Sequence, residues 1–157
     1  PWVWERKYEI DSLCYPIRLA GDLWRATGRT DHLDDTFRAA AAAILQLWRH
    51  EQDHTRSGYR FDRPDTEPHD TLSHAGRGAP VSPTGMTWSG FRPSDDACRY
   101  GYLVPANAFA VVALDDLRVR GVLTEEEFLA RVSAWFAMMD RDGDNLLTTD
   151  DFGSGKG

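Results

Sequence analysis

The spacing of apolar residues predicts two helices in the first third of the chain. Between positions 10 and 27, apolar residues recur at three- and four-residue steps, and Gly28 follows where a helix commonly ends. A second stripe begins after Thr30 or Asp31, either of which can cap a helix, and it stops before Gly58. The two stripes consist of Leu13, Ile17, Ala20 and Trp24, and of Leu33, Phe37, Ala40, Ala41, Ile44, Leu45 and Trp48. The short connection predicts that the helices run antiparallel.

A long segment rich in helix breakers precedes a third predicted helix. Residues 57–92 contain glycines and prolines at intervals too short for regular structure. Loops of this length in compact domains commonly carry function. Pro105 suits the first position of a helix whose Phe109, Val112 and Leu117 we expect to face a core. The predicted class is therefore all-α.

Composition narrows the classes of partner. The chain has 157 residues, of which 41% are hydrophobic and 27% charged, which is typical of a globular domain. Its net charge of −7 disfavours nucleic acid and anionic membranes as partners, because both require a basic face. Cys14 and Cys98 are expected to be buried free thiols, with one disulfide as the alternative. Pro1 in place of an initiator Met indicates a fragment, and the absence of a visible signal peptide favours a cytoplasmic location.

Residues 84–102, TGMTWSGFRPSDDACRYGY, combine groups that carbohydrate chemistry uses. Trp88 offers a flat apolar wall for a sugar ring, and Arg92 offers a planar set of donors for hydroxyl groups. Asp95 and Asp96 are adjacent carboxyls, and cleavage of a glycosidic bond requires one carboxyl that stays protonated as general acid. Burial against Trp88 or repulsion between the two aspartates could retain such a proton.

Two motifs in this part of the chain have structural alternatives. Ser94 could cap a helix whose first turn holds Asp95 and Asp96, and motif chemistry alone leaves that helix and a catalytic site equally open. Residues 50–54, HEQDH, match the pattern of zinc proteases, but the pattern is short and no downstream ligand extends it. We therefore set zinc aside.

Several stretches together resemble glycoside hydrolase family 125. They are TGMTWSGFRPSDDACRYGYLVPANAFAVV, WERKYEIDSLCYPIRLA and the short EQDH, YRF and DTL segments, and the resemblance covers residues 1–114. It implies an (α/α) toroid and an exo-acting, inverting, metal-independent α-1,6-mannosidase, which needs no cofactor and acts on mannose-containing oligosaccharides. It also implies that the general acid is in the Asp95–Asp96 pair, with Asp95 favoured, and that the substrate-binding residues are Trp88, Arg92, His54, Tyr100, Glu9 and Asp11.

The chain is much shorter than the domain of that family. The resemblance implies a catalytic base, a Glu, in a C-terminal part that this chain lacks, and inversion requires a base roughly 6.5–9.5 Å from the acid. Glu9 and Asp11 are the only nearby carboxylates that we would consider. We therefore expect weak mannoside binding, poor hydrolysis, and self-association through apolar helix faces that a complete toroid would cover.

Residues 140–152, DRDGDNLLTTDDF, resemble the calcium loop of an EF-hand. The oxygen ligands of such a loop would come from Asp140, Asp142, Asp144, Leu146, Thr148 and Asp151. Asn145 replaces the usual Gly, Asp151 replaces a bidentate Glu and the exit helix is missing, so the affinity for Ca²⁺ should be low. We expect two units, a partial toroid over residues 1–114 and an EF-hand-like region with a flexible tail over residues 115–157. A calcium-binding protein without enzymatic activity is the alternative function.

Overall fold

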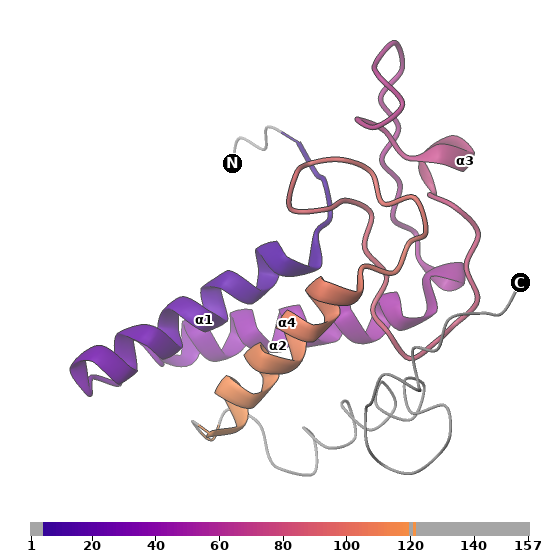
Figure 1. Ribbon diagram of the computed structural model, residues 1–157. Coiled ribbons are helices and arrows are strands. Elements are labelled where there is room, and N and C mark those ends of the chain that lie inside the picture. The colour runs from indigo at the N-terminus through magenta and orange to yellow at the C-terminus, as the bar shows by residue number, and fades with distance from the viewer. Residues whose placement is uncertain (1–4, 120, 122–157) are drawn as a thin grey trace, which may run out of the picture.

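The computed structural model describes residues 5–119 and Gly121, and within these residues every regular element is helical (Figure 1). The helices are α1 (Ile10–Thr27), α2 (Asp35–His50), the 3₁₀-helix η1 (Glu51–Arg56), the short α3 (Ser73–Gly76) and α4 (Val104–Val119). One isolated antiparallel bridge, between Phe91 and Ala97, is the only pairing of extended backbone in this part of the chain. The predicted all-α class is confirmed.

The first two helices form where the apolar spacing predicts them, but α2 begins later than expected. α1 ends at Gly28, which adopts a left-handed conformation (φ 68°). The N-cap of α2 is Asp34, whose Oδ1 accepts a hydrogen bond from Phe37 N at 2.8 Å. Neither Thr30 nor Asp31 caps this helix, because Asp34 stands closer to the first helical residue and satisfies its free amide.

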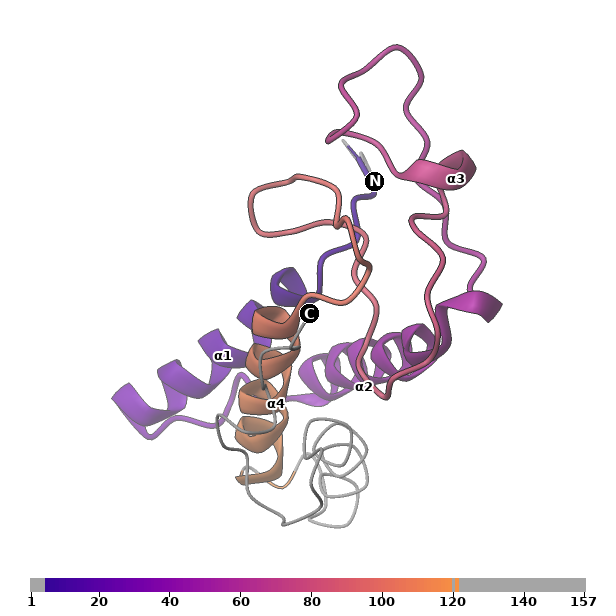
Figure 2. The ribbon, with the colours of Figure 1, turned by 45° about the vertical axis from the view of Figure 1, so that its right-hand side comes forward.

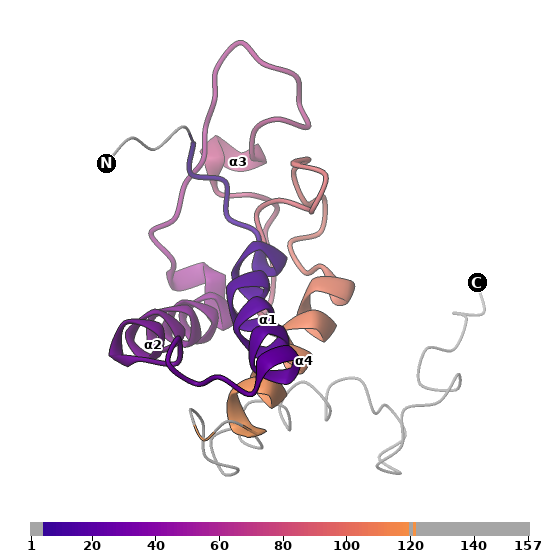
Figure 3. The same ribbon diagram turned by 90° about the vertical axis from the view of Figure 1, so that its left-hand side faces the viewer.

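α1 packs mainly against α4, and the two helices run in the same direction, whereas α1 and α2 run in opposite directions (Figures 1 and 3). Tyr15 of α1 meets the ring of Phe109 edge-on at 5.3 Å, and Arg25 forms an ion pair with Asp116. The antiparallel arrangement predicted for the first two helices is present. The main partner of α1 is nevertheless the helix that comes last in the described part of the chain.

The buried face of α4 differs in part from the predicted one. Leu117 is fully buried and Phe109 is partly buried, as expected, but Val112 is 46% exposed. Its buried apolar residues are Ala106, Ala110, Ala113, Leu114 and Leu117, three of them alanines, and Asn107 and Asp116 are buried beside them. Because alanines allow helix axes to approach closely, α4 packs these small residues towards the other helices, with Ala110 and Leu114 on the side of α2, and Val112 stays half exposed.

The long connection between η1 and α4 lies over one end of the helices, where α1 and α4 begin and α2 ends (Figures 1 and 2). Trp88 and Phe91 of this connection are fully buried and join the core that the helices form. The segment predicted as a functional loop is therefore ordered around its own aromatic residues and is anchored at the helix ends.

Both cysteines are free and buried, as predicted. Burial raises the pKa of Cys14 to about 12 and that of Cys98 to about 11, so both thiols stay protonated at neutral pH. Among the described helices, none is long and apolar enough to cross a membrane.

Candidate active site

The aspartate pair lies at the tip of a tight hairpin formed by residues 91–97. Arg92 N donates to Asp96 O at 2.9 Å, and Asp95 N donates to Arg92 O at 2.8 Å. Asp95 adopts a left-handed conformation (φ 63°), which Asp tolerates better than most residues. The alternative in which Ser94 caps a helix is wrong, because residues 91–97 contain no helix and Ser94 Oγ donates instead to Asp96 Oδ2 at 2.7 Å.

Asp96 is held as a carboxylate. Its Oδ2 accepts from the Ser94 hydroxyl and also from Arg92 Nη2 at 2.9 Å. The hydrogen bond from Ser94 and the positive charge of Arg92 lower the pKa of Asp96, with partial desolvation opposing them. A group that loses its proton this readily is a poor general acid.

Asp95 lies beside Glu9, the residue that precedes α1. Burial raises the pKa of Glu9, and the nearby carboxyls of Asp11 and Asp95 raise it further, against a hydrogen bond from Ser12 Oγ to Glu9 Oε2 of 2.6 Å. Asp95 and Asp11 are thus close enough to Glu9 for their negative charges to disfavour its ionised form. The hairpin and the start of α1 create a cluster of acidic groups in which the protonated form of Glu9 is favoured.

Asp11 adds a buried acidic group next to Glu9. It is 5% exposed, and its Oδ1 has no hydrogen-bond partner in the part of the chain that the structure describes. A buried carboxylate oxygen without a partner is costly, and it suits a water molecule or a hydroxyl group of a ligand. The structure thus brings Glu9 and Asp11 together with Asp95, three acidic residues that sequence analysis named for the site.

Trp88 lies in the core and stacks on His54, with ring centroids 3.5 Å apart and ring planes 4° apart. Gly78 and Gly101 pass so close that a Cβ atom on either would lie 2.9 or 2.7 Å from the indole. This burial corrects the prediction that Trp88 forms an exposed stacking wall for a sugar. The indole instead supports the loop from the core side, because a large apolar ring is stabilised by complete burial.

His54 is also a structural residue. Its Nδ1 lies 2.6 Å from Glu51 Oε2 and its Nε2 lies 2.9 Å from Arg77 O, so both ring nitrogens are bonded within the protein. Ser57 Oγ donates to the other oxygen of Glu51 at 2.5 Å. The HEQDH pattern is therefore a buried Glu–His pair in which both residues use their polar atoms on protein groups, and His54 is corrected from a substrate ligand to a support of Trp88.

Arg92 and Tyr100 line one pocket of about 380 Å³ beside the hairpin. Tyr100 is 75% exposed, and the guanidinium of Arg99 lies over its ring at 5.5 Å. Cys98 also lines this pocket. Aromatic surface and guanidinium donors near carboxyl groups are the mixture that binds sugar hydroxyls. These two predicted residues are therefore brought together in a place that can hold a small ligand.

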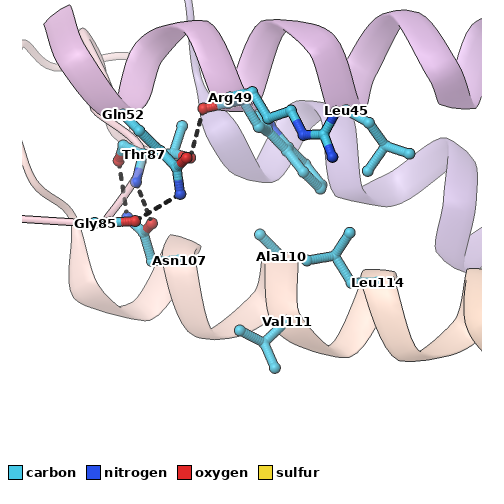
Figure 4. A pocket seen from close by; sticks show the side chains of 10 residues that line it. Leu45, Arg49, Gln52, Gly85, Thr87, Asn107, Ala110, Val111 and Leu114 are labelled. Atoms are coloured by element: carbon cyan, nitrogen blue, oxygen red, sulfur yellow. Dashed lines mark hydrogen bonds between the residues drawn. The ribbon is translucent and has the colours of Figure 1, made fainter. Parts of the chain in front are cut away.

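A second, smaller pocket of about 50 Å³ lies between α2 and α4 and contains none of the predicted site residues (Figure 4). At one end, Asn107 Oδ1 accepts from Thr87 N at 2.8 Å and Asn107 Nδ2 donates to Thr87 O at 3.0 Å. Gln52 Nε2 donates to Gly85 O at 2.7 Å. These bonds attach the loop to α4 and to η1, a role that sequence analysis did not assign to the buried Asn107.

Sequence analysis also missed Lys7. Its Nζ donates to Asp70 Oδ1 at 2.6 Å and to the backbone oxygen of Asp95 at 2.9 Å. Asp70 Oδ2 in turn accepts from Arg63 Nη1 at 2.6 Å. These groups come from segments 63 and 88 positions away from Lys7, so no local spacing could have indicated them. The predicted calcium ligands, Asp140, Asp142, Asp144, Leu146, Thr148 and Asp151, lie outside the described residues.

Comparisons with known proteins agree with the fold. A family model described as metal-independent alpha-mannosidase (GH125) matches residues 1–142, which extends past Leu114 and into the first positions of the predicted calcium loop. The meiotically up-regulated gene 157 protein of Schizosaccharomyces pombe is 35% identical over 125 residues, which are 73% of this chain and 25% of that protein.

A solved structure of a metal-independent alpha mannosidase from Streptococcus pneumoniae, in a non-productive complex with alpha-1,6-mannobiose, is also similar. It is 46% identical, with a TM-score of 0.75, over 92% of this chain and 34% of the other. The chain spans about a quarter to a third of the length of these relatives. The helical hairpins match the all-α fold predicted from the family resemblance. The chain belongs to the family of metal-independent α-mannosidases, glycoside hydrolase family 125.

Proposed function

We propose that this chain carries the proton-donating part of an exo-acting, inverting α-1,6-mannosidase, with Asp95 as the general acid. The observation that carries the proposal is the acidic cluster of Asp95, Glu9 and the buried Asp11 at the junction of the hairpin and α1, in which the protonated form of Glu9 is favoured. Hydrolysis of a glycosidic bond begins with transfer of such a proton to the bridging oxygen. Family membership indicates the class of reaction, and the acidic cluster around Asp95 indicates which residue donates the proton.

Asp95 fits this role better than Asp96. The Arg92 charge and the Ser94 hydroxyl stabilise the ionised form of Asp96. Asp95 is bonded at its backbone, and its side chain has neither of these two partners. Transfer of a proton from Asp95 to the leaving oxygen would leave Asp95 as a carboxylate.

The catalytic base comes from outside the described residues. In an inverting enzyme, a water molecule stands between the base and the sugar, which requires roughly 6.5–9.5 Å between the two carboxyl groups. Glu9 adjoins Asp95 in one acidic cluster, so we do not assign it that role. Glu9 and Asp11 therefore hold the acid and contact substrate hydroxyls, and the isolated chain is expected to hydrolyse mannosides poorly.

The substrate is a mannose-containing oligosaccharide that enters through the pocket of Arg92 and Tyr100. The relative from Streptococcus pneumoniae was solved with alpha-1,6-mannobiose, which supports this class of ligand. The family is metal-independent, so catalysis requires no cofactor. The calcium-binding alternative is not favoured, since the family match overlaps the start of the predicted loop.

Titration of the chain with α-1,6-mannobiose, followed by NMR, tests the proposal. We expect weak binding that shifts the signals of Asp95, Glu9 and Tyr100. Asp95→Asn, which cannot donate an acidic proton, should abolish any residual turnover and leave binding within a few-fold of wild type, whereas Asp96→Asn should keep part of the turnover. Binding with no shift at Asp95, or full loss of turnover in Asp96→Asn alone, would contradict the assignment.

A further inference from the structure

The backbone of the proposed acid is held by a lysine from the N-terminal segment. Lys7 Nζ donates to Asp95 O at 2.9 Å and to Asp70 Oδ1 at 2.6 Å. The Lys7 side chain is 8% exposed, and its ammonium lies 5.2 Å from the ring centroid of Phe91, at the base of the hairpin. Within this hairpin, the Lys7 ammonium therefore restrains the backbone of Asp95, which is the residue in the left-handed conformation.

The position of Lys7 is itself fixed by charge. Asp70 accepts from Lys7 on one carboxylate oxygen and from Arg63 and Thr66 on the other. Arg63 also donates to Glu5 Oε2 at 2.6 Å. Burial acts to lower the pKa of Lys7, but the hydrogen bond to Asp70 and the surrounding carboxylates outweigh it, and the pKa is raised. The ammonium is therefore charged at every pH at which a glycosidase of this kind works.

The segment that carries Asp70 also holds the other side of the hairpin. Ala97 N donates to His69 O at 2.7 Å, directly beside the residue that pairs with Lys7. The hairpin is thus bonded at its tip and at its base to one support, made from residues 5–7 and 63–70. This support contacts Asp95 through its backbone oxygen.

We propose that Lys7, held by Asp70, is a positioning residue that keeps Asp95 in the left-handed conformation in which its carboxyl lies beside Glu9. The effect of Lys7 on catalysis rests on the proposed function of Asp95, whereas its contacts with Asp95 and Asp70 do not. A backbone carbonyl that accepts from an ammonium cannot rotate freely, so the φ and ψ angles of Asp95 are restricted to the observed turn. Without Lys7, the turn would keep its internal bonds from Asp95 N to Arg92 O and from Arg92 N to Asp96 O, but the backbone oxygen of Asp95 would lose its charged donor.

Three variants and a control test this inference. Lys7→Met keeps the apolar stem and removes the ammonium, Lys7→Arg keeps the charge, and Asp70→Asn leaves Lys7 intact but removes its partner charge. Arg29→Met is the control, because Arg29 forms an exposed ion pair with Asp31 far from the hairpin. The readouts are the NMR coupling between the amide and α protons of Asp95, which reports φ, and hydrogen exchange of its amide.

We expect Lys7→Met to move the coupling towards that of a flexible chain and to speed exchange of the Asp95 amide about tenfold or more. Lys7→Arg should restore both readouts in large part, Asp70→Asn should lie between them, and Arg29→Met should change neither. Unchanged coupling and exchange at Asp95 in Lys7→Met would overturn the inference. If Lys7→Met does not fold, the same measurement on Asp70→Asn decides.

The same samples separate this inference from the proposed function. If the wild-type chain does not respond to α-1,6-mannobiose while Lys7→Met loosens Asp95, the positioning role stands and the proposed function fails. If the wild type binds mannobiose and Lys7→Met changes neither Asp95 nor the mannobiose-induced shift of its signals, the positioning role fails and the proposed function stands. Loosening of Asp95 together with loss of that shift supports both.

Discussion

Two neighbouring aspartates have opposite surroundings in this protein. Asp96 is bonded to a guanidinium and a hydroxyl, which stabilise its charge, whereas Asp95 lies near Glu9 and accepts a backbone bond from Lys7. Sequence analysis named the two aspartates as a pair from the chemistry of residues 84–102 and from the family resemblance. It could not separate their surroundings, since Glu9 and Lys7 come from a segment far away in the chain.

The role of Trp88 was beyond sequence analysis for a similar reason. An indole in a glycine-rich loop has the same local signature whether it faces a sugar or the core. Only the tertiary structure places His54 against one face of the ring and glycines around its edge. The residue that was expected to bind substrate therefore packs beneath the loop that carries Arg92 and Asp95.

The raised pKa of Glu9 predicts how stability responds to pH. Because the folded protein favours the protonated carboxyl, Glu9 stabilises the fold fully below its unfolded pKa of about 4.3, and this contribution is lost as pH rises through the higher folded pKa. Glu9→Gln removes the free-energy cost of ionising this carboxyl in the folded protein, and its amide oxygen can still accept the hydrogen bond from Ser12. We expect the variant to be more stable than wild type at pH 7, by less than about 1 kcal/mol for this partly exposed group, and to lose this advantage below pH 4.

Urea unfolding at pH 3.5, 5 and 7 measures this difference. Glu67→Gln, a change to an exposed carboxyl in the loop, serves as the matched control and should give no gain that depends on pH. Equal stability of wild type and Glu9→Gln at all three pH values would show that Glu9 carries no retained proton.

At the scale of elements, apolar periodicity gave α1 and most of α2, because both helices bury one continuous stripe. It did not give the face of α4, in which alanines rather than the larger Val112 are buried. Nor did it give the start of α2, where Thr30, Asp31 and Asp34 are all good capping residues and only the turn geometry selects one. The path of residues 57–103 depends on single polar contacts, such as those of Asn107 with Thr87, which follow no period.

The cap of α2 can be tested directly. Asp34→Ala removes the acceptor for Phe37 N and should destabilise the protein by about 1 kcal/mol. Asp31→Ala breaks an exposed ion pair with Arg29 and should change stability little, although sequence analysis named Asp31 as one of two possible caps. Urea unfolding of the two variants at neutral pH measures both effects. A larger loss in Asp31→Ala than in Asp34→Ala would contradict the observed cap.

On the scale of the whole molecule, the described helices expose apolar side chains that a larger assembly could cover. Tyr15, Leu19 and Leu23 follow one another at four-residue steps along α1, and Leu19 is 71% exposed. Val112 and Val119 lie on the exposed side of α4, the helix against which α1 packs. The chain spans only a quarter to a third of the length of its relatives. We propose that copies of the isolated chain associate through these faces.

Self-association is tested by sedimentation at a series of protein concentrations. We expect the average mass to rise with concentration, because each copy that covers Leu19 and its neighbours removes apolar surface from water. Leu19→Glu places a charge in the centre of the α1 stripe and should shift the chain towards monomer. Gln46→Glu adds the same charge at an exposed position of α2 and should leave the association unchanged. A compact monomer at every concentration, or equal effects of the two variants, would mean that these apolar side chains do not join copies of the chain.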